Sequence, residues 1–399
     1  MSEWKITRVS QMAEILSGGT PKTEVEEYWN GNIPWLSVKD FAGDARKVYD
    51  SEKHISELGL NSSATQLLYP GDLIISARGT VGEIAQIGKT SAFNQSCYGL
   101  RVADGYSSDY LYYMLKYQVR YLKSVANGAV FDTIVVKTFD RMKASVPDLP
   151  TQKRIADVLS AYDDLIENNN RRIALLEKAA QELYKEWFVR FRFPGCENVK
   201  FENGLPEGWT IKRMNDFCYV TDGTHDTPKP LDEGFPLITG RCIKNGFVDF
   251  DEAYCISEKD HENIKKRSGL SSGDILFSNI GTVGNCCIVD YSREFSVKNV
   301  IIFKPNDMIQ TAYLYYWMTS HSMQEIFATQ TNGASQQFVG LTFMRRYKIL
   351  VPTQKVLTAF GDKILPILEQ KRMLHDNNLN LAKQRDLLLP RLMSGKLEV

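Results

Sequence analysis

QKRIADVLSAYDDLIENNNRRIALLEKAAQELYKEWF, residues 152–188, is the stretch that decides the fold of this 399-residue chain. Residues suited to a helix seam recur in it at alternating steps of four and three, with Asn169 in one slot. The other seam positions are Ile155, Leu159, Tyr162, Ile166, Ile173, Leu176, Ala180, Leu183 and Trp187. A period of about 3.5 residues over about five heptads is typical of a coiled coil rather than of a surface helix. The stretch therefore predicts one long helix with a narrow seam.

A second stretch with the same period closes the sequence between Gln354 and Leu392. Its seam positions are Leu357, Phe360, Ile364, Ile367, Lys371, Leu374, Asn378, Leu381, Arg385, Leu388 and Leu392. The two helices have only each other as an obvious partner, so we expect an intramolecular antiparallel pair. The polar seam residues Asn169, Lys371, Asn378 and Arg385 either set the register or mark where the pair opens or meets partner subunits. We favour the first interpretation.

The remaining sequence is an internal repeat of one unit, at an offset of about 202–205 residues. Landmarks that match in order are Trp4 with Trp209, Lys39 with Arg241, the GTVG runs at 79–82 and 281–284, Asn127 with Asn332, and Val146–Pro147 with Val351–Pro352. Chance similarity would not keep both this order and this spacing. The sequence therefore predicts a pseudo-two-fold molecule with two similar modules.

Each module has the pattern of an α+β globule of about 145 residues, large enough for its own core. Short β-branched and aromatic runs predict strands, namely LIISA (73–77), IAQIG (84–88), TIVV (133–136), ILFSN (275–279), CCIVD (286–290) and VIIFK (300–304). Helical periods carry paired aromatic residues at 110–121 and 313–323. The predicted fold class is α+β, with two similar α/β modules joined by two long antiparallel coiled-coil helices.

Boundaries follow from the landmarks and from the breaker residues. We predict module 1 at 1–150, the first long helix at 151–193, a connector at 194–207, module 2 at 208–352 and the second long helix at 353–399. Pro390 is expected to end or kink the second helix. The aromatic segment Leu183–Phe193 is either packed into a core or exposed as a docking surface, and the sequence alone does not separate these alternatives.

Composition limits the compartment and the kind of partner. The 48 basic and 48 acidic residues cancel, whereas a protein that binds phosphates nonspecifically is strongly basic. Contact with nucleic acid would therefore need a few placed side chains or positive charge from a partner. Seven cysteines without a CxxC pair, a polar start and no long apolar run predict a cytoplasmic protein without a disulfide framework, a zinc site or a membrane segment. The Cys286–Cys287 pair is expected to pack in a strand rather than perform redox chemistry.

Catalytic motifs are absent from the sequence. GEIAQIGKT (82–90) has one residue too many between its glycines for a Walker A motif. Asp362 with Glu369–Lys371 resembles a nuclease carboxylate–lysine set but lies along the second helix, where a solvated face is expected. The five histidines lack metal-ligand spacing. Neither a GxGxxG fingerprint nor an Asn/Asp-Pro-Pro-aromatic methyltransferase motif occurs, so a catalytic function would require a partner.

The predicted architecture combines a spacer with two non-identical modules. Helices of roughly 33–38 residues span about 50 Å at 1.5 Å per residue, which equals about 15 base pairs of B-DNA. A rigid spacer with two different modules suits an asymmetric target of two parts that are separated by a segment the protein does not recognise. A structural adaptor, with two protein-binding modules and no role on DNA, has the same mechanics, and near-neutral charge is compatible with it.

Six motifs in order make the chain resemble the specificity (S) subunit of type I restriction-modification enzymes over essentially its full length. They are GGTPK…YWNGNIPWLSVKDF (18–41), GDLIISARGTVG (71–82), VPDLPTQKRIADVL (146–159), LYKEWFVRFRFPG (183–195), LPEGW (205–209) and LLLPRLMSGKL (387–397). The resemblance implies that modules 1 and 2 are target-recognition domains and that the helices dock modification subunits. In module 2 the IPW element becomes FPL and the GGTP element is stretched to DGTHDTP, so its loop geometry is expected to differ.

The resemblance also implies a set of partners. They are double-stranded DNA, two methyltransferase (modification) subunits that bind S-adenosylmethionine, and restriction or translocase subunits where the host has them. The chain itself would hold no cofactor. The methylated base would be adenine, flipped out of the duplex. We therefore expect a non-catalytic subunit that recognises a bipartite DNA site and positions the catalytic subunits on it.

Candidate DNA-reading residues are polar or cationic side chains on Gly-rich loops between the shared strands, where a loop can approach base edges closely. In module 1 they are Lys39, Ser76, Arg78, Thr80, Asn94, Gln95 and Asn127. In module 2 they are Arg241, Ser278, Asn279, Thr282, Lys298, Asn299, Asn332 and Gln336. The alternative is that the glycines only form tight strand turns with solvated neighbours. Lys39 and Arg241 could equally bind phosphates, which position a protein without specifying a sequence.

Overall fold

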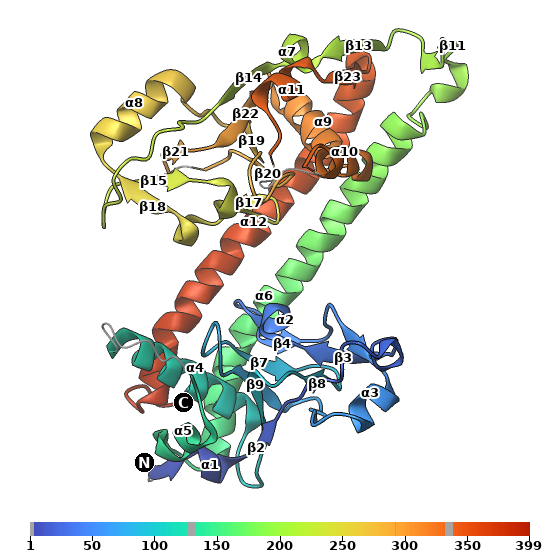
Figure 1. Cartoon of the computed structure of the whole chain (residues 1–399). Coiled ribbons are helices and arrows are strands. Elements are labelled where there is room, and N and C mark those ends of the chain that lie inside the picture. The colour runs from blue at the N-terminus through green and yellow to red at the C-terminus, as the bar shows by residue number, and fades with distance from the viewer. Residues whose placement is uncertain (1–3, 126–132, 292, 332–337) are drawn as a thin grey trace. The chain divides into compact units, whose positions relative to one another are not determined.

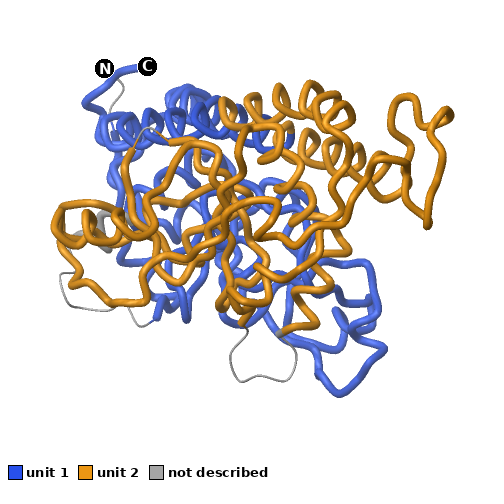
Figure 2. Tube along the Cα trace, turned by 90° about the horizontal axis from the view of Figure 1, so that it is seen from above, with its two compact units in different colours: residues 1–171, 375–399 blue, residues 172–374 orange. Residues whose placement is uncertain are grey.

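The computed structural model describes residues 4–125, 133–291, 293–331 and 338–399 (Figure 1). The chain divides into two compact units, coloured separately in Figure 2. Unit 1 contains residues 1–171 and 375–399, and unit 2 contains residues 172–374. Each unit holds one module together with part of both long helices. The units therefore cut across the helices, and the division into five segments made from the sequence stays a prediction.

Two long helices pass through both units. Helix α6 covers Leu149–Tyr184 and continues as a short π-helix, η2, at Lys185–Val189, and helix α12 covers Gln354–Met393. In unit 1, Asp163 pairs with Arg385, and Asn169 Nδ2 donates to Asn378 Oδ1 at 2.9 Å. In unit 2, Glu177 pairs with Lys371. Partner numbers on α12 fall as those on α6 rise, so the helices pair antiparallel, as the 3.5-residue period predicts.

The polar seam residues are buried and paired. Asn169, Lys371, Asn378 and Arg385 are each at most 9% exposed, and every one of them bonds to the opposite helix. This arrangement favours the interpretation that they set the register, because a shift along the seam would leave buried polar groups without partners.

Asp163 also lies in the seam, next to the predicted position Tyr162, which is only half-buried. Besides its ion pair with Arg385, Asp163 accepts a hydrogen bond from the Tyr113 hydroxyl of module 1. Burial and the negative charge of Asp163 raise the pKa of the Tyr113 hydroxyl well above its usual value. The hydroxyl thus stays protonated as a donor, and it links module 1 to the helix pair within unit 1.

The end of the second helix corrects one expectation. Pro390 does not end α12, because the helix continues to Met393. Pro366 also lies inside the same helix. Each proline removes one backbone donor, and the packing of Leu389, Leu392 and Met393 in the core of unit 1 holds the last turn in place. Tertiary packing thus outweighs the local preference of Pro390.

Unit 1 contains a five-stranded sheet in the order β2-β9-β6-β7-β4, a three-stranded sheet β5-β3-β8 and the pair β1-β10. Its elements besides the long helices are β1 Lys5–Arg8, α1 Val9–Met12, β2 Ala13–Ser17, η1 Glu26–Tyr28, β3 Ile33–Leu36, α2 Val38–Phe41, β4 Lys47–Val48, β5 His54–Ile55, α3 Glu57–Asn61, β6 Leu73–Ser76, β7 Ile84–Ile87, β8 Ala92–Phe93, β9 Cys97–Val102, α4 Ser108–Val125, α5 Val136–Arg141 and β10 Lys143–Val146.

Unit 2 repeats this plan with the sheet β14-β22-β19-β20, the sheet β18-β15-β21 and the pair β13-β23, and it adds the pairs β16-β17 and β11-β12. Its elements are η3 Cys196–Asn198, β11 Phe201–Glu202, β12 Leu205–Pro206, β13 Thr210–Arg213, α7 Met214–Phe217, β14 Tyr219–Asp222, β15 Phe235–Ile238, η4 Gly240–Cys242, β16 Ile243–Lys244, β17 Phe247–Val248, η5 Phe250–Glu252, β18 Tyr254–Ile256, α8 Glu258–Ser268, β19 Ile275–Ser278, β20 Cys286–Ile288, β21 Ser296–Val297, β22 Val300–Lys304, α9 Met308–Met318, α10 His321–Thr331, α11 Leu341–Arg346 and β23 Lys348–Val351.

The α+β class and the internal repeat are confirmed, while two local expectations differ from the structure. The run TIVV (133–136) is no strand, since Val136 begins α5. Ile134 nevertheless lies buried, and its N–H donates to the Ala77 carbonyl at 2.9 Å. The helical period expected at 313–323 is divided between α9 and α10, which are separated by two residues.

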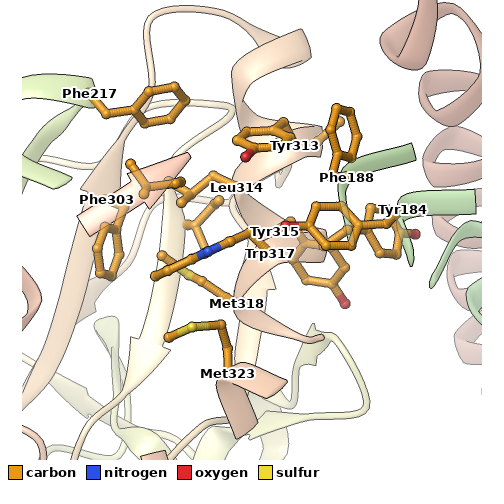
Figure 3. Packing of buried hydrophobic residues seen from close by; sticks show 14 of the residues in the cluster. Tyr184, Phe188, Phe217, Phe303, Tyr313, Leu314, Tyr315, Trp317, Met318 and Met323 are labelled. Atoms are coloured by element: carbon orange, nitrogen blue, oxygen red, sulfur yellow. The ribbon is translucent and has the colours of Figure 1, made fainter. Parts of the chain in front are cut away.

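The aromatic segment at the end of α6 is part of the core of unit 2 (Figure 3). Tyr184, Trp187 and Phe188 are at most 6% exposed. The Phe188 ring lies 4.8 Å from both the Tyr313 and the Phe360 rings, edge to face. Of the two alternatives left open by the sequence, the structure supports packing into a core.

The cysteines are free thiols. Cys286 and Cys287 follow each other in β20 and are buried, and burial raises the pKa of the Cys286 thiol well above its usual value. A buried protonated thiol is a poor nucleophile, which agrees with a packing role. In the part of the chain that the structure describes, no helix is long and apolar enough to cross a membrane.

Candidate nucleic-acid interface

In module 1 the candidate residues gather at one edge of the three-stranded sheet. Strands β3 and β8 run parallel, so their carboxyl ends meet at the same edge. The N–H of Asn94, which follows β8, donates to the carbonyl of Leu36 at the end of β3, at 3.0 Å. Helix α2 begins directly after β3 and carries the exposed Lys39. Lys39, Asn94 and Gln95 therefore share this edge, although their positions in the sequence are far apart.

The end of β6 reaches the same edge. The N–H of Ala77 donates to the Ser96 carbonyl at 2.8 Å, which places the turn between β6 and β7 beside the residues that follow β8. Arg78 and Thr80 are exposed in this turn. Ser76 is fully buried, and its hydroxyl donates to the Thr80 carbonyl at 2.5 Å and accepts from the Glu83 N–H at 2.8 Å. In this conformation Ser76 shapes the turn that presents Arg78 and Thr80.

Module 2 builds an equivalent edge from β15 and β21, which also run parallel. The N–H of Lys298 donates to the Ile238 carbonyl at 2.9 Å, matching the Asn94 bond of module 1. Arg241 is exposed on the short 3₁₀ helix η4 that follows β15. The ammonium group of Lys298 donates to the Thr227 hydroxyl at 2.6 Å. Two cationic side chains thus lie where module 1 has Lys39 and Asn94.

The turn after β19 completes the edge of module 2. The Thr282 hydroxyl donates to the Gly240 carbonyl at 3.0 Å and lies 2.9 Å from the Ser278 hydroxyl. These bonds tie the turn to η4, the helix of Arg241. Ser278 is fully buried, and Asn279 is 6% exposed with its Nδ2 bonded to the Val339 carbonyl at 3.2 Å. Both buried side chains support the loops in this conformation.

The structure thus brings the described candidates of each module together but gives them different accessibility. Exposed candidates are Lys39, Arg78, Thr80, Gln95, Arg241 and Thr282. Half-buried candidates are Asn94, Lys298 and Asn299, and buried ones are Ser76, Ser278 and Asn279. Asn127, Asn332 and Gln336 lie outside the described residues.

Three further polar residues at these edges were not singled out from the sequence, namely Thr20 in module 1 and His225 and Arg267 in module 2. Thr20 donates to Gln95 Oε1, His225 lies 2.9 Å from Asn299 Oδ1, and Arg267 pairs with Asp222 at 2.8 Å. The GGTPK and DGTHDTPK runs contain the first two, so their place in a shared loop was visible. The sequence did not show that their side chains contact residues about 74 or 75 positions away in the chain.

The glycines of the two GTVG runs do form tight turns. Gly79 and Gly281 have φ of 76° and 74°, a left-handed conformation that glycine adopts without steric cost. Nothing lies within 4 Å of a Cβ built on either glycine, so backbone conformation rather than crowding favours glycine here. The turns are compatible with both interpretations given above, since a tight turn also presents its neighbours.

The aspartates of the GDL and GDI runs are structural. Asp72 pairs with Arg101 at 2.9 Å, and Asp274, its counterpart, pairs with Lys304. The hydrogen bonds that Arg101 donates to Asp72 raise the pKa of its guanidinium. Each pair connects the start of a central strand, β6 or β19, to the neighbouring strand β9 or β22. These carboxylates are therefore engaged in holding the sheets.

The edges offer hydrogen-bond donors and acceptors of the kind that bind base edges and phosphates. Cations, amides and hydroxyls suit guanine, adenine and phosphate oxygens. Within the described ranges, no group of His, Cys, Asp and Glu side chains is arranged to hold a metal ion. The arrangement can recognise a polar surface.

Comparison with known proteins identifies the family. A family model described as the type I restriction modification DNA specificity domain matches residues 1–178 and 206–378. The chain is 27% identical to the type I restriction enzyme MjaIX specificity subunit of Methanocaldococcus jannaschii, over 100% of this chain and 94% of that protein. It is 22% identical to the HindI specificity subunit of Haemophilus influenzae, over 69% of this chain and 74% of that one.

A solved structure supports the fold. The crystal structure of a type I restriction-modification system S subunit from M. genitalium aligns with a TM-score of 0.55 at 14% identity, covering 98% of this chain and 96% of that one. The family model alone covers well over half of the chain, in one copy per module. The chain therefore belongs to the family of type I restriction-modification specificity subunits, which are non-catalytic.

Proposed function

We propose that this chain recognises a bipartite site on double-stranded DNA, with one half-site bound by each module, and positions methyltransferase subunits on it. The observation that carries the proposal is the convergence of polar and cationic side chains at the carboxyl ends of the parallel strands in both modules. Membership of a DNA specificity family supports the same function. The two edges differ in sequence, which suits two different half-sites.

Modification subunits would supply the methyltransferase chemistry and part of the positive charge. The chain has 48 basic and 48 acidic residues, whereas affinity for DNA rests largely on neutralising phosphates. Lys39, Arg78 and Arg241 are therefore placed to choose a sequence rather than to supply the whole affinity. Restriction subunits, where a host has them, would join the same assembly.

The long helices carry the proposed docking sites for the modification subunits. Large apolar side chains on them face solvent, namely Leu165, Leu175, Met373, Leu379 and Leu387, each 53–63% exposed. Water-exposed apolar groups on otherwise charged helices gain free energy when a partner covers them.

Introducing charge into this surface is expected to weaken assembly. Replacing Leu175 and Met373 together by glutamate should lower the affinity for the modification subunit at least about tenfold, because burying two carboxylates at an interface is costly. Binding to the purified modification subunit is measured by calorimetry. Leu58→Glu on α3 is the matched control, since Leu58 is 61% exposed but lies on module 1 away from both helices. Equal affinities for the double variant and the control would contradict docking on the helices.

Sequence reading by module 1 is tested at Arg78. In a complex with modification subunits, Arg78→Ala is expected to reduce discrimination at one base pair of one half-site by about 10- to 100-fold, because a bidentate arginine contributes about 1–3 kcal/mol. Enrichment from a DNA library randomised at both half-sites gives this ratio. The other half-site should keep its preference.

Arg141, exposed in the last turn of α5, provides the matched control. Arg141→Ala removes the same charge away from the β3–β8 edge and should leave both half-sites unchanged. A uniform loss of affinity with Arg78→Ala, accompanied by a weaker dependence on salt, would assign Arg78 to a phosphate instead. Absence of any sequence enrichment by the unaltered complex would favour the structural adaptor.

A further inference from the structure

Thr20 and His225 occupy the same place in the two modules. The N–H of Gly19 donates to the Phe93 carbonyl at 3.0 Å, and the N–H of Thr224 donates to the Val297 carbonyl at 3.0 Å. Phe93 and Val297 are the last residues of the equivalent strands β8 and β21. The residue that follows each donor is therefore equivalent, and it is Thr20 in one module and His225 in the other.

Each of these residues holds the side-chain amide of a candidate reader. The Thr20 hydroxyl donates to Gln95 Oε1. In module 2, His225 Nδ1 lies 2.9 Å from Asn299 Oδ1. Asn299 has a φ of 52°, a left-handed conformation that asparagine tolerates better than most residues. In both modules, the second residue after β8 or β21, which is Gln95 or Asn299, is thus paired with a side chain from the loop that follows β2 or β14.

We propose that Thr20 and His225 are positioning residues that hold the Gln95 and Asn299 amides at this edge, and that His225 decides which group of the Asn299 amide, oxygen or nitrogen, faces a base. The proposal rests on the function proposed above, since it assumes that this edge meets DNA. An amide has an acceptor oxygen and a donor NH₂ group on opposite sides. A neighbour that binds the oxygen leaves the NH₂ group facing outward, and the reverse also holds.

In module 2, the group of the Asn299 amide that faces outward depends on the protonation of His225. The other ring nitrogen, Nε2, lies 2.9 Å from Asp222 Oδ2, and Arg267 binds Asp222 Oδ1 at 2.8 Å. A carboxylate only accepts hydrogen bonds, so Nε2 carries a proton in either ring state. The charged groups around the ring in the described part of the unit are Asp222 on β14, Arg267 on α8, Lys298 after β21 and the adjoining Asp226.

The two ring states present Asn299 differently. A protonated ring donates from Nδ1 to Asn299 Oδ1, across the 2.9 Å contact between these atoms, and leaves the NH₂ group outward. A neutral ring with its proton on Nε2 has a lone pair on Nδ1, so Asn299 must turn its NH₂ group inward and its oxygen outward. Outward NH₂ suits guanine O6 or N7 and thymine O4, whereas an outward oxygen suits adenine N6 or cytosine N4.

Module 1 supplies an internal control in the same molecule, because the pair of Thr20 and Gln95 contains no group that titrates near neutral pH. The preference of module 2 at one base pair should therefore change with pH while the half-site of module 1 stays the same. A merely structural role of His225 would alter stability or overall affinity and would not change one base preference with pH.

The experiment uses the full chain in complex with its modification subunit and a DNA library randomised at both half-sites. Bound DNA is sequenced at about pH 5.5 and about pH 8.5, at constant salt. We expect an approximately tenfold change in preference at one base pair of the module 2 half-site. His225→Ala should abolish this change, and Thr20→Val should alter one position of the module 1 half-site equally at both pH values.

Asp222→Asn tests the role of the His225 proton most directly. An amide at position 222 can donate to Nε2, so a neutral ring then keeps its proton on Nδ1 and donates to Asn299 at both pH values. The low-pH preference should therefore persist at high pH. Thermal unfolding verifies that each variant is folded, and His225 is suitable for replacement because its side chain is 60% exposed.

The outcomes separate this inference from the proposed function. If Asn299→Ala changes the preference while pH and His225→Ala do not, positioning by His225 is overturned and DNA reading stands. If Asn299→Ala leaves the preference intact, Asn299 does not read a base and the inference is overturned alone. If the unaltered complex enriches no sequence, the proposed function fails, and the inference fails with it.

Discussion

Replacing Asp163 by alanine is expected to lower the free energy of unfolding by about 3–5 kcal/mol, because the buried Arg385 loses the more buried of its two carboxylate partners, Asp163 and Asp386. Asp163 and Arg385 have side chains only 4% and 7% exposed, and the Tyr113 hydroxyl would lose its acceptor as well. The urea midpoint of unfolding, followed by circular dichroism, gives the change.

Two controls make this prediction specific. Asp157→Ala, on an exposed position of the same helix, should change the free energy of unfolding by less than about 0.5 kcal/mol. Replacing Asp163 and Arg385 together by leucine should recover most of the loss, because a buried ion pair is often matched by an apolar pair of similar volume. A loss below about 1 kcal/mol with Asp163→Ala alone would show that Arg385 finds water or another partner.

Replacing Phe188 by alanine is expected to destabilise unit 2 by about 3–5 kcal/mol, the usual cost of removing a buried phenyl ring and leaving a cavity. Phe188 is 4% exposed, and its ring contacts Tyr313 and Phe360 at centroid distances of 4.8 Å. Trp187 and Trp209 belong to the same cluster, and the rings of both lie within 6.3 Å of the Phe188 ring. Urea unfolding followed by tryptophan fluorescence therefore reports directly on this core.

Val189, the next residue, is the matched control, since its side chain is 54% exposed. Val189→Ala should change the free energy of unfolding by less than about 0.5 kcal/mol. The contrast between adjacent positions distinguishes packing of the segment into a core from an exposed docking surface. Similar losses at both positions would mean that the segment is covered on both sides and would contradict the packing described above.

The helix pair could be predicted from the sequence because the 3.5-residue period of the seam is visible within the sequence of each helix alone. Asp163 was missed for the opposite reason. An acidic residue is almost never fully buried unless it is paired, and its partner Arg385 lies 222 positions away in the chain. Of the two effects expected of Pro390, ending the helix did not occur, because local helix preference is overridden when the following turn packs into a core.

The sequence predicted which loops form the candidate interface better than it predicted which of their side chains are exposed or paired. Gly-rich runs at equivalent places in a repeat identify which loops approach each other, and the structure brings Lys39, Arg78 and Gln95 to one edge. Burial of Ser76 and Ser278 depends on how each turn closes, which the sequence pattern does not reveal. The pairing of His225 with Asn299 arises from two loops that meet only when β14 and β21 are assembled.

The two-module account of DNA reading is tested most directly by mapping methylated adenines across the genome. Cells with and without this chain are compared, the modification subunit being present in both. The account predicts a bipartite methylated motif that disappears without the chain, and it predicts that exchanging residues 1–150 for those of a relative changes only one half of that motif. An unchanged methylation map, with the chain expressed and folded, would contradict DNA targeting by this subunit and favour the adaptor.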